Sequence, residues 1–469
     1  MSTSVQKEKK GLNVSAKSFI TAILVLLVLM VATYILTLVI PGGLYPRIAD
    51  SSGNLQIDTS GQFTYVEGGL PFWKWILSPV LVLGSSGSGT LIAVLAFLLV
   101  VGGIFNALEK GQLMQYILGR IVSRFGHARY SLQAVITLFF MAMGAFIGSF
   151  EECVPLVPLV VALSLKLGWD ALTGLGMSLL AAGCGFASGV CNPFTVGVAQ
   201  ELSGLSMFSG MGLRLVGFVL IYGLLTLFLR RHSRKVAAPL TGSGLDIHQV
   251  QPDMNRGMWA FAIILGLGIL LVLCSSFLPF LQSMTMVIVA VMFLVAGIAA
   301  TLISGMSVKN LCRHFLNGLV SILPAVLMIL MASSIKFTME EAHILDTLLH
   351  GAVGLAENLP KWAVILFIYL LVLVMNFFIS SGSAKAFLLI PLIVPLAGVF
   401  GLSPQLCVMA FAFGDGFSNV FYPTNPVLLI SLGLADTGYG KWVRWSWKFQ
   451  LANLILTSLL LLLGLVIGY

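Results

Sequence analysis

The sequence predicts an all-α polytopic membrane protein made of two inverted repeats, each with a re-entrant helical hairpin and a discontinuous transmembrane helix. Composition is the first observation behind this fold class. Of the 469 residues, 58% are hydrophobic and only 9% are charged, with a mean hydropathy of +1.03, whereas a soluble protein of this length needs more charged surface. The second observation is an internal repeat, and the third is a pair of Asn-Pro breaks at matching places within it.

The charged residues set the expected orientation of the chain. Basic residues cluster in short loops beside apolar runs, which is the positive-inside bias of membrane proteins. The net charge of +8 is therefore interpreted as orientation in a lipid bilayer, and no nucleic-acid partner is expected. We expect a multi-pass protein of the plasma (inner) membrane with a cytoplasmic N-terminus and an external C-terminus.

The first half is predicted to comprise residues 1–231. An apolar run at about 19–40 is long enough to span, and it ends in Pro-Gly-Gly without a small-residue cleavage pattern, so it is not read as a signal peptide. The acidic loop 43–72 is expected outside. Further helices are expected at about 89–108 and 211–229, with a short interfacial segment opening at Pro71 and a basic amphipathic helix over 112–130.

The run 131–166 is predicted to be a re-entrant hairpin. Its middle, at about 148–153, holds small residues and the two acids Glu151 and Glu152, and both of its ends are flanked by basic residues. The alternative of two complete spans would place both acids at the far surface. The next run, 169–204, is predicted to be a membrane helix that is interrupted in its middle.

The second half is predicted to comprise residues 257–469, after a polar cytoplasmic linker at 232–256. It contains a second hairpin at about 362–400 and a second broken helix at about 404–436. Its remaining helices are expected at about 257–280, 284–304, 315–337 and 449–468, with an acidic external loop after 337 that carries Glu340, Glu341, Asp346 and Glu357.

Short matches between the halves support the inverted repeat. The matched pairs are 102–109 with 333–340, 146–149 with 378–381, and 191–193 with 424–426. The charges alone give the two members of each pair opposite orientations in the membrane, so the repeat and the topology are independent observations.

The breaks and the hairpin tips are the predicted binding site. A broken helix exposes unpaired N–H groups that attract anions and unpaired C=O groups that coordinate small cations, and Asn-Pro favours such a break. A single Pro kink is usually repaired by neighbouring helices, but two at matched places, each downstream of a polar hairpin, favour a site. The substrate- or ion-binding residues expected there are Ser149, Glu151, Glu152, Ser188, Asn192, Thr195, Ser381, Ser383, Lys385, Asp415, Asn419, Thr424 and Asn425.

Charged residues inside a membrane are costly and are functional by default. Glu151 and Glu152 are interpreted as coupling-ion ligands, as proton carriers or as partners of a cationic substrate group. The structural alternative is an ion pair with Lys385 that holds the hairpin. Lys385 itself is interpreted either as a partner for a substrate carboxylate or as a base that snorkels to the outer surface.

Two further acids have local alternatives. Asp415 is interpreted as an ion ligand or as the cap of a half-helix, and Asp170 as the cap of its own helix. A sodium site near Glu151, Asn192 and Asn425 is a hypothesis, with Na+ or H+ as the coupling ion. No cofactor is expected, and the six cysteines have no CxxC spacing that would indicate a metal or disulfide framework.

Three stretches of the chain resemble the YfcC-type branch of the anaerobic four-carbon dicarboxylate carrier family, within the ion transporter superfamily. They are GSFEECVPLVPLVVALSLKLGWD, CNPFTVGVAQELSG, and SSGSAKAFLLIPLIVPLAGVFGL followed by FAFGDGFSN. The resemblance implies two re-entrant hairpins, a scaffold and a moving transport domain, elevator-type alternating access and a homodimer. It also implies a small-molecule substrate among dicarboxylates, exchanged basic amino acids or other small organic acids.

The functional prediction is a non-enzymatic secondary transporter or exchanger. Acids at one tip and Lys385 at the other favour a substrate with both an amine and a carboxylate, hence an amino acid, with a basic one favoured; a dicarboxylate or other small carboxylate is the alternative. An intramembrane aspartyl protease using Asp415 and Asp170 is a remote alternative, because the Gly-x-Gly-Asp motif lacks its first Gly. A channel is a third alternative, and ATP-driven pumping is disfavoured because the sequence has no P-loop.

Overall fold

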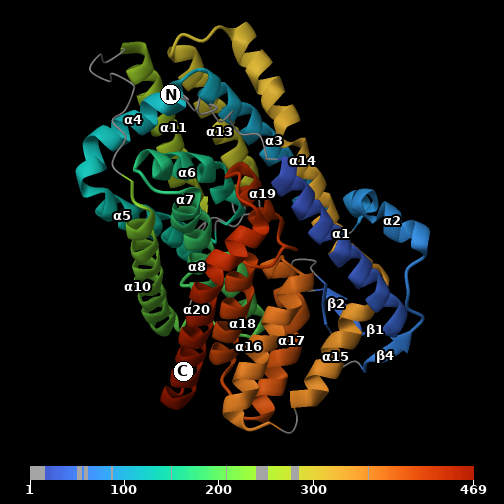
Figure 1. Ribbon diagram of the computed structural model, residues 1–469. Helices are drawn as coiled ribbons and strands as arrows, with labels where there is room; N and C mark the ends of the chain where they lie inside the picture. The colour runs from blue at the N-terminus through green and yellow to red at the C-terminus, as the bar shows by residue number, and fades with distance from the viewer. Residues whose placement is uncertain are drawn as a thin grey trace, which may run out of the picture.

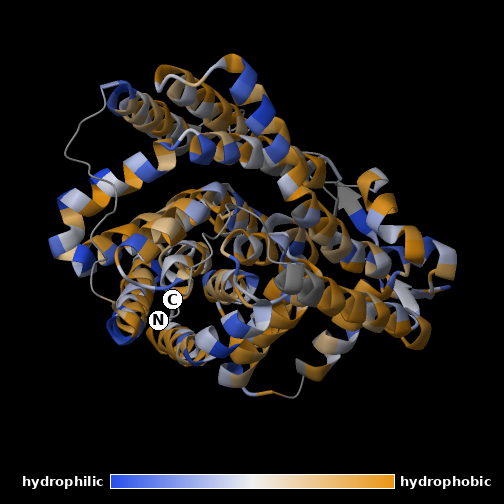
Figure 2. Ribbon diagram, turned by 45° about the horizontal axis from the view of Figure 1, so that its top comes forward, coloured by the Kyte–Doolittle hydropathy of each residue, from blue (hydrophilic) through white to orange (hydrophobic). Residues whose placement is uncertain are grey.

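The chain is a helical, polytopic membrane protein, as predicted. The computed structural model describes residues 16–49, 55–57, 62–85, 88–148, 150–206, 209–238, 252–275, 285–356 and 359–469. Within these ranges, seven helical segments are long and apolar enough to cross a membrane, and Figure 2 shows hydrophobic residues along most of the helices. The large apolar side chains Val28, Val219 and Val466 are 63%, 57% and 83% exposed, as residues that face lipid would be.

One group of helices, called here the first helix group, comes from both halves of the sequence (Figure 1). Helix α3 packs on α13 and α14, α13 packs on α11, and α1 packs on α14. The members are α1 (Ala16–Val39), α3 (Ser88–Lys110), α11 (Pro252–Ser275), α13 (Thr285–Ile303) and α14 (Val308–Glu341). At its edge lie α2 (Phe72–Leu81) and α15 (Ile344–Ala356), and α4 (Leu113–Phe125) leads from it to the other helices.

The remaining helices form a second helix group, which contains both predicted hairpins and both predicted broken helices. From the first half it takes α5 (Arg129–Ala142), α6 (Val157–Lys166), α7 (Ala171–Leu175), α8 (Ala181–Ser188), α9 (Val198–Leu202) and α10 (Met211–Val236). From the second half it takes α16 (Lys361–Phe378), α17 (Gly382–Val399), α18 (Pro404–Asn419), α19 (Pro426–Leu434) and α20 (Tyr439–Ile467). Short π-helical and 3₁₀ turns at Met143–Ile147, Glu151–Leu156, Gly176–Leu180 and Pro193–Gly197 connect the first set.

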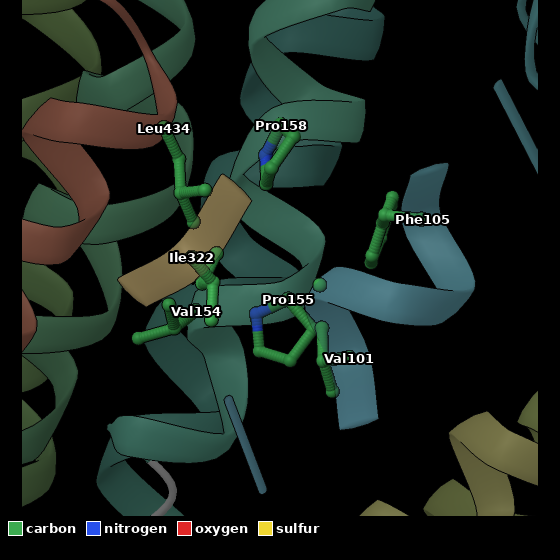
Figure 3. A pocket seen from close by; sticks show the side chains of 8 residues that line it. Val101, Phe105, Val154, Pro155, Pro158, Ile322 and Leu434 are labelled. Atoms are coloured by element: carbon green, nitrogen blue, oxygen red, sulfur yellow. The ribbon is translucent and has the colours of Figure 1, made fainter. Parts of the chain in front are cut away.

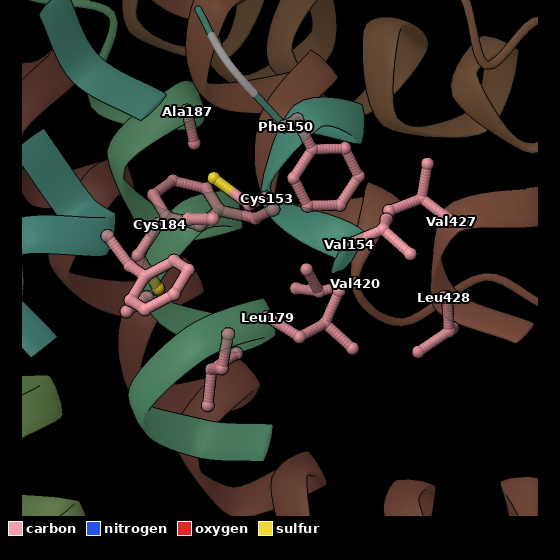
Figure 4. Close-up of a cluster of buried hydrophobic side chains, with 14 of the residues drawn as sticks. Phe150, Cys153, Val154, Leu179, Cys184, Ala187, Val420, Val427 and Leu428 are labelled. Atoms are coloured by element: carbon pink, nitrogen blue, oxygen red, sulfur yellow. The ribbon is translucent and has the colours of Figure 1, made fainter. Parts of the chain in front are cut away.

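Helix α8 lies at the centre of the second group and contacts its neighbours through glycines. A Cβ on Gly185 would stand 1.9 Å from the Met141 carbonyl oxygen of α5, and one on Gly416 of α18 would stand 2.2 Å from the Ala187 Cα of α8. These distances are too short for any side chain, so glycine permits the close backbone approach that is typical of membrane helix packing. The buried cluster of Figure 4 fills the space between the first hairpin and the two broken helices.

The loop predicted at 43–72 contains short strands, which the all-α prediction did not include. Strand β1 (Gly42–Leu44) pairs antiparallel with β4 (Thr64–Val66), and β2 (Arg47–Ala49) pairs with β3 (Leu55–Ile57). Each strand has three residues, too few to show a periodic pattern in the sequence.

The predicted acidic loop after residue 337 is mostly helical, and its residue Glu357 lies outside the described part of the chain. Helix α14 continues to Glu341, and α15 occupies most of the remainder. Asp346 stands in the first turn of α15, where a carboxylate is favoured by the helix dipole, and it forms an ion pair of 2.9 Å with Arg47. The Tyr45 N–H donates to the same carboxylate at 3.0 Å, so this acid is structural and fastens the strands to α15.

The predicted linker 232–256 is too long at both ends. Helix α10 continues through Val236 and α11 begins at Pro252, because a helix can extend beyond the apolar run that hydropathy detects. Residues 239–251 lie outside the described part of the chain. The predicted cap at Asp170 is confirmed, because its side chain accepts from the Thr173 N–H at 2.9 Å.

Candidate functional site

The first break follows helix α8. Gly189 has a left-handed conformation (φ 51°, ψ 44°) and ends the helix, as glycine commonly does. The chain then passes through Asn192, which is fully buried, and its side-chain oxygen accepts from the Phe194 N–H at 3.0 Å. This bond satisfies one of the N–H groups at the start of the second half-helix.

The second break has the same local geometry. Helix α18 ends at Asn419 and α19 begins at Pro426. The side-chain oxygen of Asn425 accepts from the Val427 N–H at 2.9 Å, the same two-residue spacing as at Asn192. The Asn425 amide also donates to the side-chain oxygen of Asn419 at 2.9 Å. Both Asn-Pro pairs thus end one half-helix and start the next.

Both hairpin tips reach the first break. A Cβ on Gly148 in the first tip would stand 2.4 Å from the side-chain oxygen of Asn192. A Cβ on Gly382 in the second tip would stand 2.6 Å from Thr195 Cγ2 and 2.8 Å from Asp415 Oδ2. Four separate elements therefore meet around these five residues, which are called here the central site.

A buried ion pair supports the second tip. Lys385 and Asp415 both have fully buried side chains and form a salt bridge. The Lys385 Nζ also donates to the Asn376 side-chain oxygen and, at 3.1 Å, to the Ile379 carbonyl oxygen. The three Nζ donors of Lys385 therefore have three protein acceptors. A buried ion pair is tolerated only when such further bonds satisfy it.

Asn376 connects this ion pair to the second break. Its amide nitrogen, which carries two donors, lies within hydrogen-bond distance of three acceptors: the Asp415 carbonyl at 3.0 Å, Ser418 Oγ at 2.6 Å and the Asn419 side-chain oxygen at 2.9 Å. Since Asn419 also accepts from Asn425, one polar network runs from the second tip to the second break. Buried networks of this kind are rigid when their members are satisfied.

Several polar atoms of the central site lack a protein partner among the described residues. They are Asn192 Nδ2, Thr195 Oγ1 and Asp415 Oδ2, together with Thr424 Oγ1 at the second break. Leaving buried polar atoms unpaired costs free energy, so a ligand that pairs with them would be stabilised. The set offers a carboxylate oxygen as acceptor, an amide as donor, and two hydroxyls that can act as either.

Three other predicted binding residues, Ser188, Ser381 and Ser383, are in the described part of the chain. Ser188 is buried and donates to the Gly185 carbonyl of its own helix at 2.7 Å. Ser381 is exposed and caps α17, and Ser383 is half-buried. Ser149 and the side chain of Glu152 lie outside the described part of the chain.

The proposed ion pair between Glu151 and Lys385 is not formed. Glu151 begins the 3₁₀ turn of the first hairpin and is half-buried, whereas Lys385 pairs with Asp415. Lys385 does not snorkel either, because its side chain has no exposed surface. The reason is that Asp415, thirty residues away in the sequence, lies next to the second tip after folding.

The two acids of the protease alternative are not brought together. Asp170 caps α7 and bonds to His232 at 3.0 Å, while Asp415 pairs with Lys385. In the first broken helix, Ala187 and not Asp170 is the residue that packs beside Asp415. Ala187 contacts Gly416, the residue that follows Asp415 in α18. Seventeen helical residues span roughly 25 Å, whereas an aspartyl dyad needs its carboxyls about 3 Å apart.

Sequence reasoning missed two polar residues near the site. Asn376 lies one turn before the second tip and organises the network. Arg214 is fully buried in α10, and its guanidinium donates to the Val190 carbonyl at 3.3 Å and the Ser209 carbonyl at 2.8 Å, beside the first break. Both stand alone in apolar runs, which is the signal by which intramembrane polar residues are found.

A small apolar cleft lies between the two helix groups (Figure 3). It is lined by Val101, Gly102 and Phe105 of α3, Ile322 of α14, Val154, Pro155 and Pro158 of the first hairpin, and Leu434 of α19. This lining has no polar side chain to orient a charged ligand, so we interpret it as part of the contact between the groups. In the described ranges no cluster of three or more His, Cys, Asp or Glu is arranged to hold a metal ion.

Comparisons with known proteins point to membrane carriers. A family model described as "DcuC: C4-dicarboxylate anaerobic carrier" matches residues 19–466. The chain is 29% identical over 410 residues to the Escherichia coli (strain K12) protein named "Putative basic amino acid antiporter YfcC", covering 82% of this chain and 80% of that protein. It is 25% identical over 383 residues to an uncharacterized protein of Haemophilus influenzae, covering 79% of this chain and 75% of that one.

Two solved structures of transporters match the chain over most of its length. The Alcanivorax borkumensis YdaH transporter is 19% identical with a TM-score of 0.44, covering 96% of this chain and 99% of that chain. Neisseria gonorrhoeae MtrF, whose structure is described as illuminating a class of antimetabolite efflux pumps, is 16% identical with a TM-score of 0.46, covering 94% of each chain.

Proposed function

Because the chain belongs to the C4-dicarboxylate anaerobic carrier family, we propose that it is a secondary active transporter that exchanges small organic ions by elevator-type alternating access. A basic amino acid is the favoured substrate. The proposal places the substrate at the central site, where both hairpin tips meet the first break. It includes a homodimer in the plasma (inner) membrane, with a cytoplasmic N-terminus and an external C-terminus.

The charge balance at the central site carries the proposal. Lys385, the base at the tips, has all three donors occupied by protein acceptors. Asp415 keeps one carboxylate oxygen without a partner among the described residues, and Glu151 stands in the first hairpin. A substrate ammonium would pair with these acids, whereas a dicarboxylate would bring two negative charges toward them. Like charges at short range in a low-dielectric site repel strongly.

The name of one related protein favours the same substrate class. The name of the Escherichia coli protein specifies basic amino acids and antiport, and a basic amino acid carries one more ammonium group than a neutral one. In exchange, two similar molecules cross in opposite directions, so the site can alternate between them without a separate driving ion. We retain Na+ or H+ near Glu151, Asn192 and Asn425 as a hypothesis for coupled transport.

Four-carbon dicarboxylates are the second candidate substrate. The description of the family names them, and Arg214 supplies a specific observation in their favour. Its Nε atom is buried without a partner among the described residues, and its guanidinium already bonds to Val190 beside the first break. An arginine with a free donor pairs well with a carboxylate.

Thermal stabilisation of the purified protein separates the candidates. A ligand that binds only the folded state raises the melting temperature. We expect arginine, lysine or ornithine to raise it, and counter-exchange of the same amino acids in liposomes to follow. Stabilisation by dicarboxylates alone would overturn the favoured substrate.

Two variants test the location of binding, one in the first hairpin and one in the central site. Glu151→Gln and Asn192→Ala should abolish exchange while the protein remains folded and monodisperse. Exchange at the wild-type rate in both variants would contradict the assignment of the central site.

A further inference from the structure

The surroundings of the Lys385 ammonium are those of a bound cation. Its nitrogen contacts three oxygens: a carboxylate oxygen of Asp415, the side-chain amide oxygen of Asn376 and the backbone carbonyl oxygen of Ile379. All three side chains involved are buried, with Lys385 and Asp415 fully so. These oxygens come from three places in the chain: the end of α16, the residue after it, and α18.

These three oxygens are of the kinds that hold small metal cations in transporters. Carboxylate, amide and backbone carbonyl oxygens are the preferred ligands of hard cations. In broken-helix transporters the carbonyls at the C-terminal ends of half-helices coordinate the coupling cation. Ile379 follows directly after the last residue of α16, at the negative end of the helix dipole. The Lys385 nitrogen thus takes the position that a sodium ion would occupy.

We propose that the Lys385 ammonium is a tethered cation, which permanently fills a sodium-type site at the second hairpin tip. The inference builds on the proposed transport function, since it describes how the same central site is charged. A positive charge is needed there, because Asp415 would otherwise be a buried, unpaired carboxylate. The chain supplies this charge itself and takes no ion from solution at this position.

The tethered charge has a consequence for coupling. Lys385 belongs to α17, the second arm of the hairpin whose tip carries Gly382, so its charge stays with the protein throughout a transport cycle. This site therefore adds no sodium to the stoichiometry and responds to no sodium gradient. That behaviour suits an exchanger, in which one substrate drives the other.

Removing the lysine should convert the site into one that binds sodium. In Lys385→Ala the three oxygens remain and the ammonium is lost. The melting temperature of this purified variant should rise with NaCl, in a saturable way, compared with choline chloride at the same ionic strength. In the wild-type protein, and in the Lys361→Ala control at an exposed lysine of α16, any difference between the two salts should be unaffected by Asp415→Asn. The double variant Lys385→Ala/Asp415→Asn should lose the sodium response, because the anionic ligand is gone.

Each result of this experiment decides the inference. A sodium response in Lys385→Ala that depends on Asp415 supports it. A folded Lys385→Ala without a sodium response overturns it, and so does a wild-type sodium response that Asp415→Asn abolishes. If Lys385→Ala is recovered only when sodium is present during extraction, that also supports it; if it is never recovered, Lys385→Gln takes its place with the same two criteria. Because melting is measured without substrate, failure here is distinct from failure of amino-acid exchange in liposomes.

Discussion

The Lys385–Asp415 pair places two opposite charges inside the second helix group. Both side chains are fully buried. Asn376 holds the pair in place, because its amide donates to the Asp415 carbonyl and its side-chain oxygen accepts from the Lys385 ammonium. Two charges withdrawn from water are tolerated because they neutralise each other and because each ammonium donor has an acceptor. The carboxylate oxygen left over, Asp415 Oδ2, is available to a ligand.

Changing one partner of this pair should be worse for stability than changing both. Asp415→Asn leaves the Lys385 ammonium buried without its counter-charge, and we expect a loss of about 3–5 kcal/mol. Lys385→Met/Asp415→Asn removes both charges and should recover most of that loss. Both variants should exchange at less than a tenth of the wild-type rate, because both lack the free carboxylate oxygen. Melting curves and liposome exchange check the two parts.

The outcomes of this comparison are distinct. An Asp415→Asn protein as stable as the wild type would show that the ion pair does not support the fold. A double variant with full exchange would show that Asp415 does not contact the substrate.

Asp170 provides a pH-dependent contribution to stability at the edge of the second helix group. Burial alone would raise the pKa of its carboxyl, but hydrogen bonds from His232 and from the Thr173 side chain and N–H lower the pKa to about 2. An unfolded Asp has a pKa of about 3.9, so the folded state binds the proton less tightly. The stabilisation is therefore present above about pH 4 and is lost as the pH falls toward 2.

Asp170→Asn should remove this dependence. Because the carboxylate is partly exposed, the contribution is on the order of 1 kcal/mol. The difference in melting temperature between wild type and Asp170→Asn should be constant from pH 7 to 5 and should shrink between pH 4 and 3. A difference that stays constant down to pH 3 would contradict the role of this carboxylate.

The sequence predicts a feature of the site when the residues that determine it are neighbours in the chain. The Asn-Pro pairs predict the helix breaks at Asn192 and Asn425, because the conformational effect of proline acts on the preceding residue. The partner of Lys385 was not identified, because pairing between α17 and α18 arises only from tertiary packing. Asn376 was overlooked because a single amide in an apolar run gives a weak signal.

At the scale of elements, glycines determine how closely the second tip approaches the first break. Gly382 is the first residue of α17, and the position of its absent Cβ lies within 2.8 Å of both Thr195 and Asp415. Real Cβ atoms do not approach other atoms so closely, so any larger residue must displace the tip or its neighbours.

Gly382→Ala should therefore impair transport, although it adds only one methyl group. We expect exchange to fall at least tenfold, because the tip moves away from the site. Gly398→Ala is the matched control in the same helix, since a Cβ there meets nothing within 4 Å. It should keep full exchange and raise stability by up to about 1 kcal/mol, the usual gain for Ala over Gly in a helix. Equal exchange by the two variants would contradict the close approach of tip and break.

The elements themselves were predicted well where hydrophobicity defines them and poorly where it does not. The hairpin arms α16 and α17 lie within the predicted 362–400 apart from one residue, and α18 and α19 lie within 404–436. Helix α14 extends beyond the predicted 315–337 at both ends, because its polar ends continue the helix into regions that hydropathy assigns to loops. The three-residue strands near residues 42–66 have no signal of their own.

At the scale of the whole molecule, composition predicts the membrane class but not the arrangement of helices into two groups. Each group combines helices from both halves of the sequence, and no local pattern specifies which helices pack together. The groups contact each other through α14 with α19 and through α3 with the 3₁₀ turn of the first hairpin. This contact includes the apolar cleft of Figure 3. An apolar contact has no directional bonds to break when it slides, which suits elevator-type motion of one group against the other.

A reversible bridge across this contact should stop transport. In a background without the six native cysteines, Ile322→Cys and Leu434→Cys place one thiol on each helix group at the cleft that both residues line. A short bifunctional methanethiosulfonate, which forms a disulfide with each thiol and releases sulfinate, should join them and lower exchange at least tenfold, and reduction of the disulfides should restore it. The control pair Val101→Cys with Ile322→Cys lies within the first group and should keep full exchange after the same treatment. If the bridged Ile322–Leu434 pair exchanges normally, the two groups do not move past each other at this contact, and the moving part must be sought in the hairpin tips alone.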